Sequence, residues 1–121
     1  MRQMSFALTV PQVRARAKFV TRRLGCKDAK PGMMVQAVDK VMGFRKGQHP
    51  VKLDVIRFVD VRFEPLRRLL DEPEYGAEEM VLEGFPDWAP SVFVEMLCIG
   101  SCCTPETIVT RIKFEYVEVN E

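Results

Sequence analysis

A lysine and a threonine stand three residues apart near the N-terminus, in the segment Arg16-Ala17-Lys18-Phe19-Val20-Thr21-Arg22-Arg23. A lysine amine that has lost its proton can act as a base towards a neighbouring hydroxyl, as in the Ser-Lys and threonine variants of hydrolytic triads. The two arginines that follow can hold a phosphate or an anionic intermediate. The spacing leaves three interpretations open: a segment that binds a nucleotide, one that also acts on it, or a basic turn after a short helix.

Positive charge is concentrated in the first thirty residues, where eight lysines and arginines stand against Asp28 as the one acidic residue. The whole chain has a net charge of only +1, because acidic residues outnumber lysines and arginines after position 60. A local basic patch attracts phosphate groups whatever the total charge. The acidic segment 71–83 is either a solvated face or a surface that contacts another protein.

The length of 121 residues and the apolar share of 47% are typical of one globular domain, which we expect to span residues 1–121. No apolar run reaches the ~18 residues that a membrane span needs. The N-terminal segment 1–10 does not resemble a signal peptide, because its apolar part is short and interrupted by polar residues. We therefore expect a cytoplasmic protein with no membrane partner. Nothing in the sequence indicates a homo-oligomer.

The candidate metal ligands are four cysteines and one histidine. Cys98, Cys102 and Cys103 form a C-x3-C-C cluster, while Cys26 and His49 are remote from it in sequence. Structural zinc sites usually take four ligands from spaced pairs. The sequence therefore predicts no metal and no cofactor, and in a cytosol the thiols are expected to be reduced.

The order of the expected elements predicts an α+β fold without regular βαβ alternation. Pro11 suits the first turn of a helix that would run through Ala17 and place Lys18 at its C-terminal end. The longest strand candidate, 51–64, is partly apolar on both faces, which favours a sharply curved sheet or small barrel with helices against its outside. We expect strands over 3–9, 33–42, 51–64 and 108–116, and helices over 11–17, 65–70, part of 71–82, and 89–97.

The chain resembles the ASCH domain, a member of the PUA-like superfamily, and is most similar to the small ASCH proteins of phages and bacteria. The family's Gly-x-Lys-Thr-x-Thr-x-Arg motif corresponds to residues 16–23, and its Lys-Pro-Gly-Asp to Lys30-Pro31-Gly32. Glu83-Gly84-Phe85 and the closing strand 109–114 also match in order and spacing. The resemblance implies a small PUA-like β-barrel of about five to six strands, with helices flanking the rim and a cleft that faces RNA or a nucleotide.

One branch of the family hydrolyses N4-acetylcytidine to cytidine and acetate. The resemblance implies that the catalytic residues of this branch correspond to Lys18, Thr21 and Glu83 of this chain, and that the arginine of its motif corresponds to Arg23. Thr21 would attack the acetyl carbon, Lys18 would be the base, and Glu83 would relay a proton or orient Lys18. The chain departs from the motif at Phe19, which replaces a threonine, and at Arg16, which stands where glycine is common.

We prefer the interpretation of an RNA- or nucleotide-binding module that recognises a nucleobase or modified nucleoside in a basic cleft. The alternatives are the amidohydrolase just described and a ribonuclease that uses the same cleft. With His49 as the single histidine, a two-histidine acid–base mechanism is disfavoured. The predicted phosphate contacts are Arg14, Lys18, Arg22 and Arg23, and the predicted base-stacking residues are Phe19 and Trp88.

Overall fold

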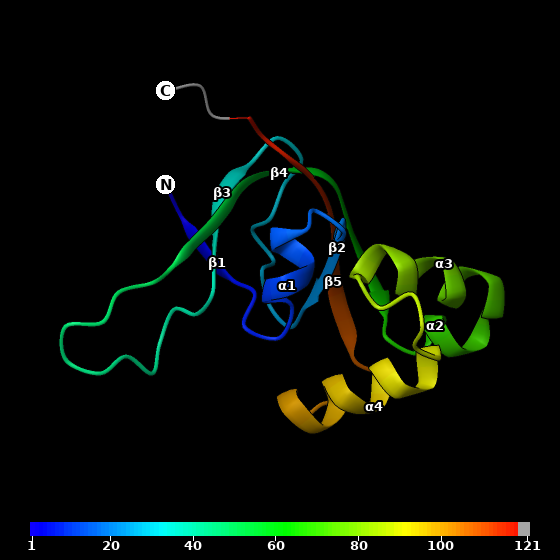
Figure 1. The fold of residues 1–121 in the computed structure, drawn as a ribbon. Coiled ribbons are helices and arrows are strands. Elements are labelled where there is room, and N and C mark those ends of the chain that lie inside the picture. Colours follow the sequence, from blue (N-terminus) through cyan, green and yellow to red (C-terminus); the bar gives the residue numbers. More distant parts are fainter. Residues whose placement is uncertain (119–121) are drawn as a thin grey trace.

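The computed structural model describes residues 1–118 and contains a five-stranded mixed sheet and four helices (Figure 1). The α+β class predicted from the sequence is therefore confirmed. In chain order the elements are β1 (Gln3–Ser5), α1 (Val10–Arg14), β2 (Val20–Arg23), β3 (Met34–Val38), β4 (Lys52–Pro65), α2 (Arg68–Asp71), α3 (Pro73–Glu83), α4 (Pro90–Ser101) and β5 (Ile108–Tyr116).

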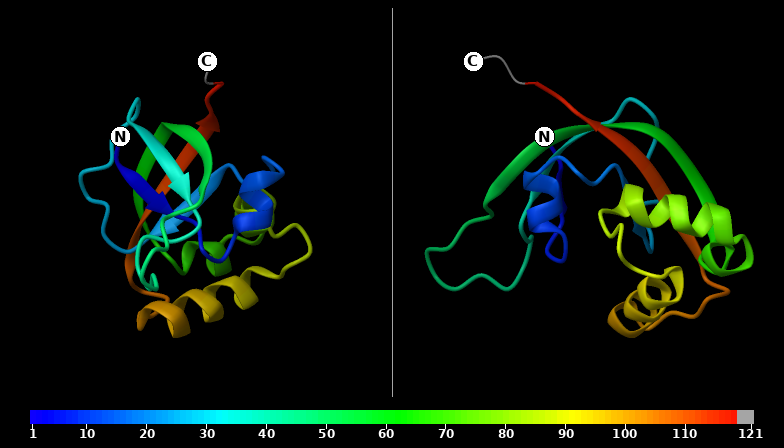
Figure 2. Two further views of the ribbon diagram at one scale, coloured as in Figure 1. Left: turned by 60° about the vertical axis from the view of Figure 1, so that its left-hand side comes forward. Right: turned by 45° about the vertical axis from the view of Figure 1, so that its right-hand side comes forward.

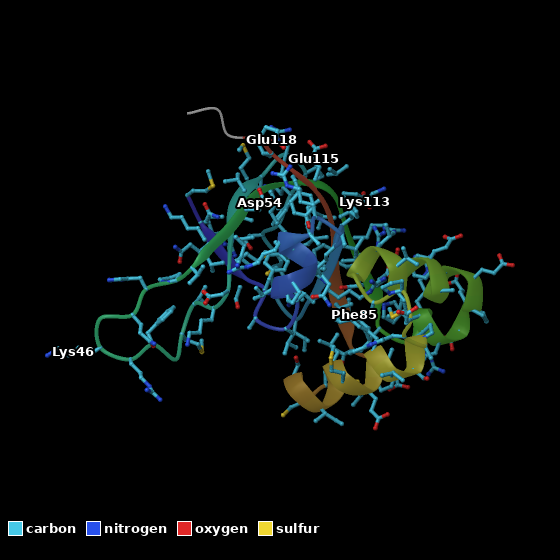
Figure 3. All side chains as sticks on the ribbon, in the orientation of Figure 1. Lys46, Asp54, Phe85, Lys113, Glu115 and Glu118 are labelled. Carbon is cyan, nitrogen blue, oxygen red and sulfur yellow. The ribbon has the colours of Figure 1, made fainter. Side chains whose placement is uncertain are left out.

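The sheet has the strand order β1-β3-β4-β5-β2, in which β1 and β3 are parallel and every other pair is antiparallel. The long strand β4 pairs with β3 along its first half and with β5 along its second half. Figure 2 shows β4 and β5 arching together over α1. The loop 39–51 projects from one end of this arch, with Lys46 far out on it, and α2, α3 and α4 lie at the other end (Figures 1 and 3).

The sheet is open across residues 1–118, because β1 and β2 form its two edges and do not pair with each other. The number of strands lies in the expected range, but the expected closure into a barrel is not seen. The curvature predicted for the long strand is present, since a register shift interrupts the β4–β5 pairing between Phe58 and Asp60. Such a bulge increases the local bend of a strand.

The bulge also changes which residues of β4 face the core. Ile56 and Phe58 are buried with Ile112 and Phe114 of β5, and Val61 packs against the same cluster after the shift. Val59, which the alternation placed with Val61, is exposed. The other face of β4 and β5 carries Glu64 and Arg111 towards α3. One face of the sheet therefore covers an apolar core, and the other carries charged groups under a helix.

Local sequence signals explain where the helices begin and end. Pro11, Pro73 and Pro90 stand in the first turns of α1, α3 and α4, where a missing backbone N–H costs nothing. Helix α3 ends at Gly84, whose φ of 94° is left-handed, so Glu83 is the last residue of that helix. Helix α1 is shorter than predicted, because Arg16 takes a left-handed φ of 53°. Lys18 therefore follows the helix instead of ending it.

A second apolar cluster joins the helices to the end of the sheet. Its buried members include Leu69 of α2, Met80 of α3, Phe93 of α4 and Val109 of β5. None of the helices in residues 1–118 is long and apolar enough to cross a membrane.

Gly76 should be essential to the packing of α3 on α2. A Cβ at this position would collide with the carbonyl oxygen of Leu69 and lie 3.0 Å from Cγ of Pro90. We expect Gly76→Ala to lower the free energy of unfolding by about 1–3 kcal/mol, the usual cost of overpacking. Gly100→Ala is the control, since a Cβ there meets open space on α4; it should be neutral or stabilising by up to about 1 kcal/mol. Urea unfolding measures the free energy of unfolding of both variants, and an equal change in Gly76→Ala and Gly100→Ala would refute the packing argument.

Candidate functional site

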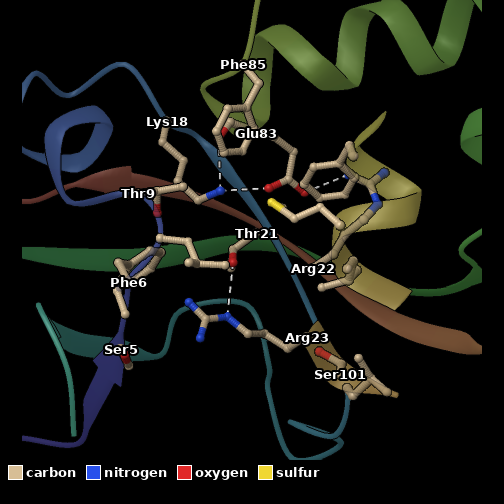
Figure 4. A pocket seen from close by; sticks show the side chains of 16 residues that line it. Ser5, Phe6, Thr9, Lys18, Thr21, Arg22, Arg23, Glu83, Phe85 and Ser101 are labelled. Carbon is tan, nitrogen blue, oxygen red and sulfur yellow. Dashed lines mark hydrogen bonds and ion pairs between the residues drawn. The ribbon is translucent and has the colours of Figure 1, made fainter. Parts of the chain in front are cut away.

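A cavity of about 310 Å³ opens between the segment after β1, strand β2 and the ends of α3 and α4 (Figure 4). One part of its wall is polar and charged, and another part, from Phe6 and α4, is apolar. This volume is at the small end of the range for small-molecule pockets. The lining residues discussed below are Phe6, Thr9, Lys18, Thr21, Arg22, Arg23, Glu83, Phe85, Phe93, Met96 and Leu97.

Backbone contacts on both sides hold Lys18 at the cavity. The carbonyl of Lys18 accepts a hydrogen bond of 2.5 Å from the Tyr116 hydroxyl. The next residue, Phe19, donates its N–H to the carbonyl of Leu82 at 2.7 Å and accepts from the N–H of Phe114 at 2.9 Å. The segment before β2 is thereby tied to both α3 and β5. This arrangement turns the amine of Lys18 towards the end of α3.

The carboxylate of Glu83 is shared between two cations. Its Oε1 accepts from Nζ of Lys18 at 2.7 Å, and its Oε2 accepts from Nη1 of Arg22 at 2.9 Å. The amine of Lys18 also donates to the carbonyl oxygen of Glu83 at 3.0 Å. Gly84 allows the end of α3 to pack closely on α1, since a Cβ there would lie 2.8 Å from Cγ of Gln12. The predicted meeting of Lys18 with Glu83 is thus present in the structure.

Burial lowers the pKa of Lys18, although the charge and hydrogen bond of Glu83 oppose the shift, and the nearby charges of Arg23 and Arg22 add to it. Desolvation disfavours the charged amine, because the side chain is almost wholly removed from water. A lysine in this environment loses its proton at a lower pH than an exposed one. That is the property a general base needs.

Arg22 lies in a buried network of opposite charges behind the cavity wall. Its Nη2 donates to Oε1 of Glu79 at 2.5 Å, to the Tyr75 hydroxyl at 3.2 Å and to Oε2 of Glu64 at 3.3 Å. Arg111 donates to both oxygens of Glu79, at 2.5 and 3.0 Å. The buried charged residues of the described chain are three cations and three carboxylates: Lys18, Arg22, Arg111, Glu64, Glu79 and Glu83. Their charges balance, as buried ions require.

The ionisation of Glu79 depends on this network. Burial alone would raise its pKa, but the hydrogen bond from Arg111 and the charge of Arg22 outweigh burial and lower that pKa to about 2. Burial and the hydrogen bond to Glu64 raise the pKa of Tyr75 to about 12, so its hydroxyl remains a donor. Glu79 therefore stays charged at neutral pH and fixes both arginines in place.

Thr21 and Arg23 point to the cavity from the same side of β2, as residues two apart on a strand do. The hydroxyl of Thr21 accepts a hydrogen bond of 3.0 Å from Nε of Arg23. The guanidinium of Arg23 lies over the ring of Phe6, 4.7 Å from its centre. Figure 4 shows Thr21 between the amine of Lys18 and the guanidinium of Arg23. The site thus brings a hydroxyl together with an amine of lowered pKa, a carboxylate and a guanidinium.

Five of the predicted site residues line this cavity and three do not. Lys18, Thr21, Arg22, Arg23 and Glu83 are brought together. Arg14 is exposed at the end of α1, Phe19 packs edge-on against Tyr116 at 5.7 Å, and Trp88 stacks on Phe85 at 4.1 Å.

The predicted contacts of those three residues with nucleic acid remain predictions that the cavity does not support. His49 also lies outside the cavity lining, in the projecting loop. RNA cleavage likewise remains a prediction.

Several residues of the site were missed at the level of sequence. Tyr75 and Glu79 precede the predicted Glu83 at four-residue spacing and so share one face of α3 with it, a pattern that indicates polar contacts on an acidic helix. Thr9 and Phe6 come from the irregular segment after β1; the strand expected over 3–9 is wrong beyond Ser5. The apolar wall is formed by Phe93, Met96 and Leu97, which lie in the helix predicted over 89–97 but were not predicted as part of a site.

The described residues contain no group of three or more histidines, cysteines or acidic residues arranged to hold a metal ion. All four cysteines are free thiols. The sulfurs of Cys98 and Cys103 lie 3.7 Å apart at the end of α4. This contact accompanies the left-handed Cys102, where the N–H of Cys103 donates to the carbonyl of Cys98.

A crystal structure of protein EF3133 from Enterococcus faecalis V583, whose description names the family DUF984, is similar to this chain. The TM-score is 0.60 and the sequence identity 16%, with 97% of this chain and 76% of that chain covered. A likeness at this identity shows a common fold and says nothing of function. No family model and no curated protein matches the chain.

Glu79 offers a test of the buried network. We expect Glu79→Gln to lower the free energy of unfolding by about 3–5 kcal/mol at pH 7, because it leaves two buried arginines without their shared carboxylate. Glu78→Gln, on the exposed side of the same helix, should change it by less than about 0.5 kcal/mol.

The free energy of unfolding of the same two variants should depend differently on pH. The folded pKa of Glu79 lies below the unfolded value of ~4.3, so its stabilisation is present above about pH 5 and is lost as the pH falls towards about 2. Stability of the wild type and of Glu78→Gln should therefore fall more steeply over this window than that of Glu79→Gln. Parallel slopes would contradict the role of Glu79.

Proposed function

We propose that the cavity binds a single nucleobase or modified nucleoside, in a small α+β protein of the ASCH type within the PUA-like superfamily. The observation that carries this proposal is the convergence of Lys18, Thr21 and Glu83 at one cavity, although Glu83 lies more than sixty residues from the other two in sequence. The resemblance to the ASCH family points to the same three residues from the sequence alone. Their meeting is therefore independent support for the resemblance.

The walls of the cavity suit a flat heterocycle. Phe6, Phe85 and Phe93 supply apolar surface, and the edge groups of Lys18, Thr21 and Glu83 supply donors and acceptors. A base has an apolar face and a polar edge, and proteins read isolated bases by using both. A volume of about 310 Å³ favours one nucleoside over a stretch of duplex, whose grooves are read by an exposed element.

The first test is binding. We expect cytidine and N4-acetylcytidine to bind the wild-type protein, and Thr21→Val to weaken binding about tenfold, because it removes a hydroxyl and frees the Nε of Arg23. Thr104→Val, which changes an exposed threonine outside the cavity, is the matched control and should bind like the wild type. Isothermal titration calorimetry measures each affinity. Absence of binding by the wild type, or equal loss in both variants, would contradict the proposal.

Hydrolysis of an N4-acetylated cytidine is the second candidate function, and the lowered pKa of Lys18 favours it. Oγ1 of Thr21 attacks the acetyl carbon while neutral Lys18 takes the proton of the Thr21 hydroxyl. The amine then returns that proton to the departing N4 of cytosine. Water subsequently cleaves the acetyl–threonine ester, releasing acetate. Glu83 orients Lys18 through the 2.7 Å contact, and Arg23, which lies next to Thr21, would stabilise the negative charge that develops on the acetyl carbonyl oxygen.

The pH dependence of acetate release tests this mechanism. We expect kcat/KM to rise with pH and level off above the pKa of Lys18, at a lower pH than for an exposed lysine. Glu83→Gln keeps an acceptor for Lys18 but removes the negative charge that raises its pKa, so the midpoint should move to lower pH. Thr21→Val should abolish turnover. A midpoint that stays unchanged in Glu83→Gln would exclude Lys18 as the base.

A further inference from the structure

Arg23 differs from the other cations of the cavity wall in having no carboxylate partner. Lys18 and Arg22 each form ion pairs of 2.9 Å or shorter with Glu83, and Arg22 also pairs with Glu79. Arg23 forms no ion pair within residues 1–118: no carboxylate oxygen of these residues lies within 4.0 Å of a nitrogen of its guanidinium. In the empty site, with Lys18 protonated against Glu83, the buried charges behind it are already balanced. Arg23 is therefore a surplus positive charge at the cavity.

The contacts of Arg23 leave its outer nitrogens for a ligand. Its Nε donates to Thr21 and its guanidinium plane lies on Phe6, which fixes the orientation of the group. No hydrogen bond from Nη1 or Nη2 to another described residue is present. Two guanidinium nitrogens held in one plane match two oxygens of a phosphate.

The environment of this side chain disfavours an unpaired charge. Burial lowers the pKa of Arg23, and only the more distant charges of Cys26 and Glu83 oppose the shift. A guanidinium that has lost part of its hydration, without gaining a counter-ion, raises the free energy of the empty site. An anionic ligand would remove this cost, whereas a neutral nucleoside would not.

We propose that Arg23 forms a phosphate subsite, so that the ligand of the cavity is a nucleoside monophosphate in preference to the nucleoside. This inference rests on the proposed function for the nucleoside part. The base would occupy the side of Lys18 and Glu83, and the phosphate the side of Arg23, with Thr21 between them (Figure 4). Arg22, which the sequence also suggested as a phosphate ligand, is engaged by its three carboxylate neighbours.

The experiment compares cytidine, cytidine 5′-monophosphate and inorganic phosphate by calorimetry at low salt. In the wild type we expect the monophosphate to bind about tenfold or more tightly than cytidine, the usual gain from charged hydrogen bonds. Arg23→Gln should reduce this ratio to within about threefold, and Arg23→Lys should retain part of it. Inorganic phosphate should raise the melting temperature of the wild type but not that of Arg23→Gln.

Arg45→Gln removes the same charge from the exposed loop 39–51, whose projection away from α4 is visible in Figure 3, and should leave the ratio unchanged. Circular dichroism checks that each variant is folded. If Arg23→Gln is unfolded, two other measurements test the subsite: the affinity ratio in Arg23→Lys, and competition between inorganic phosphate and the monophosphate for the wild type. An equal affinity for the two ligands in the wild type, or an unchanged ratio in folded Arg23→Gln, overturns the subsite. Binding of phosphate and the monophosphate without cytidine would support the subsite and refute nucleobase recognition. Failure of all three ligands would refute both.

Discussion

The shared carboxylate of Glu83 is the interaction on which the arrangement of the site depends. Its two oxygens bind Lys18 and Arg22, residues from the segment around β2, at the end of a helix formed more than sixty residues later. Because each of these groups is buried, none can be left unpaired without a large cost in free energy. The end of α3 is therefore fixed against β2 by charge, and the position of the amine at the cavity follows from that contact.

The alternation of side chains along β2 divides the basic segment into two functions. Arg22 points towards α3, where it is neutralised by Glu64, Glu79 and Glu83. Thr21 and Arg23 point to the cavity on the opposite side of the strand. Two adjacent arginines that look equivalent in the sequence thus have different roles. Arg22 holds α3 against the sheet through ion pairs, and Arg23 faces the cavity without a counter-ion.

Features set by local sequence were predictable, and those set by long-range pairing were not. Pro90 in the first turn predicted the start of α4 to within one residue, although the helix continues to Ser101, and the alternation of 108–116 predicted both ends of β5. The single-residue shift near Val59 depends on the pairing of β4 with β5, so the alternation of β4 alone could not reveal it. For the site, spacing selected Lys18 and Thr21, but Glu83 came only from the family resemblance. Phe19 lies outside the cavity lining because its direction depends on its contact with Tyr116.

Arg16 has a backbone conformation that favours glycine, and its contacts bear on the position of Lys18. Its φ of 53° is left-handed, a conformation that favours glycine and is unfavourable for a larger residue. The side chain compensates through contacts that glycine cannot make: it pairs with both oxygens of Asp54, contacts Glu118, and lies 5.4 Å from the centre of the Tyr116 ring. Tyr116 in turn donates to the carbonyl of Lys18. These contacts therefore connect Arg16 to β5, whose Tyr116 holds the backbone of Lys18 in place.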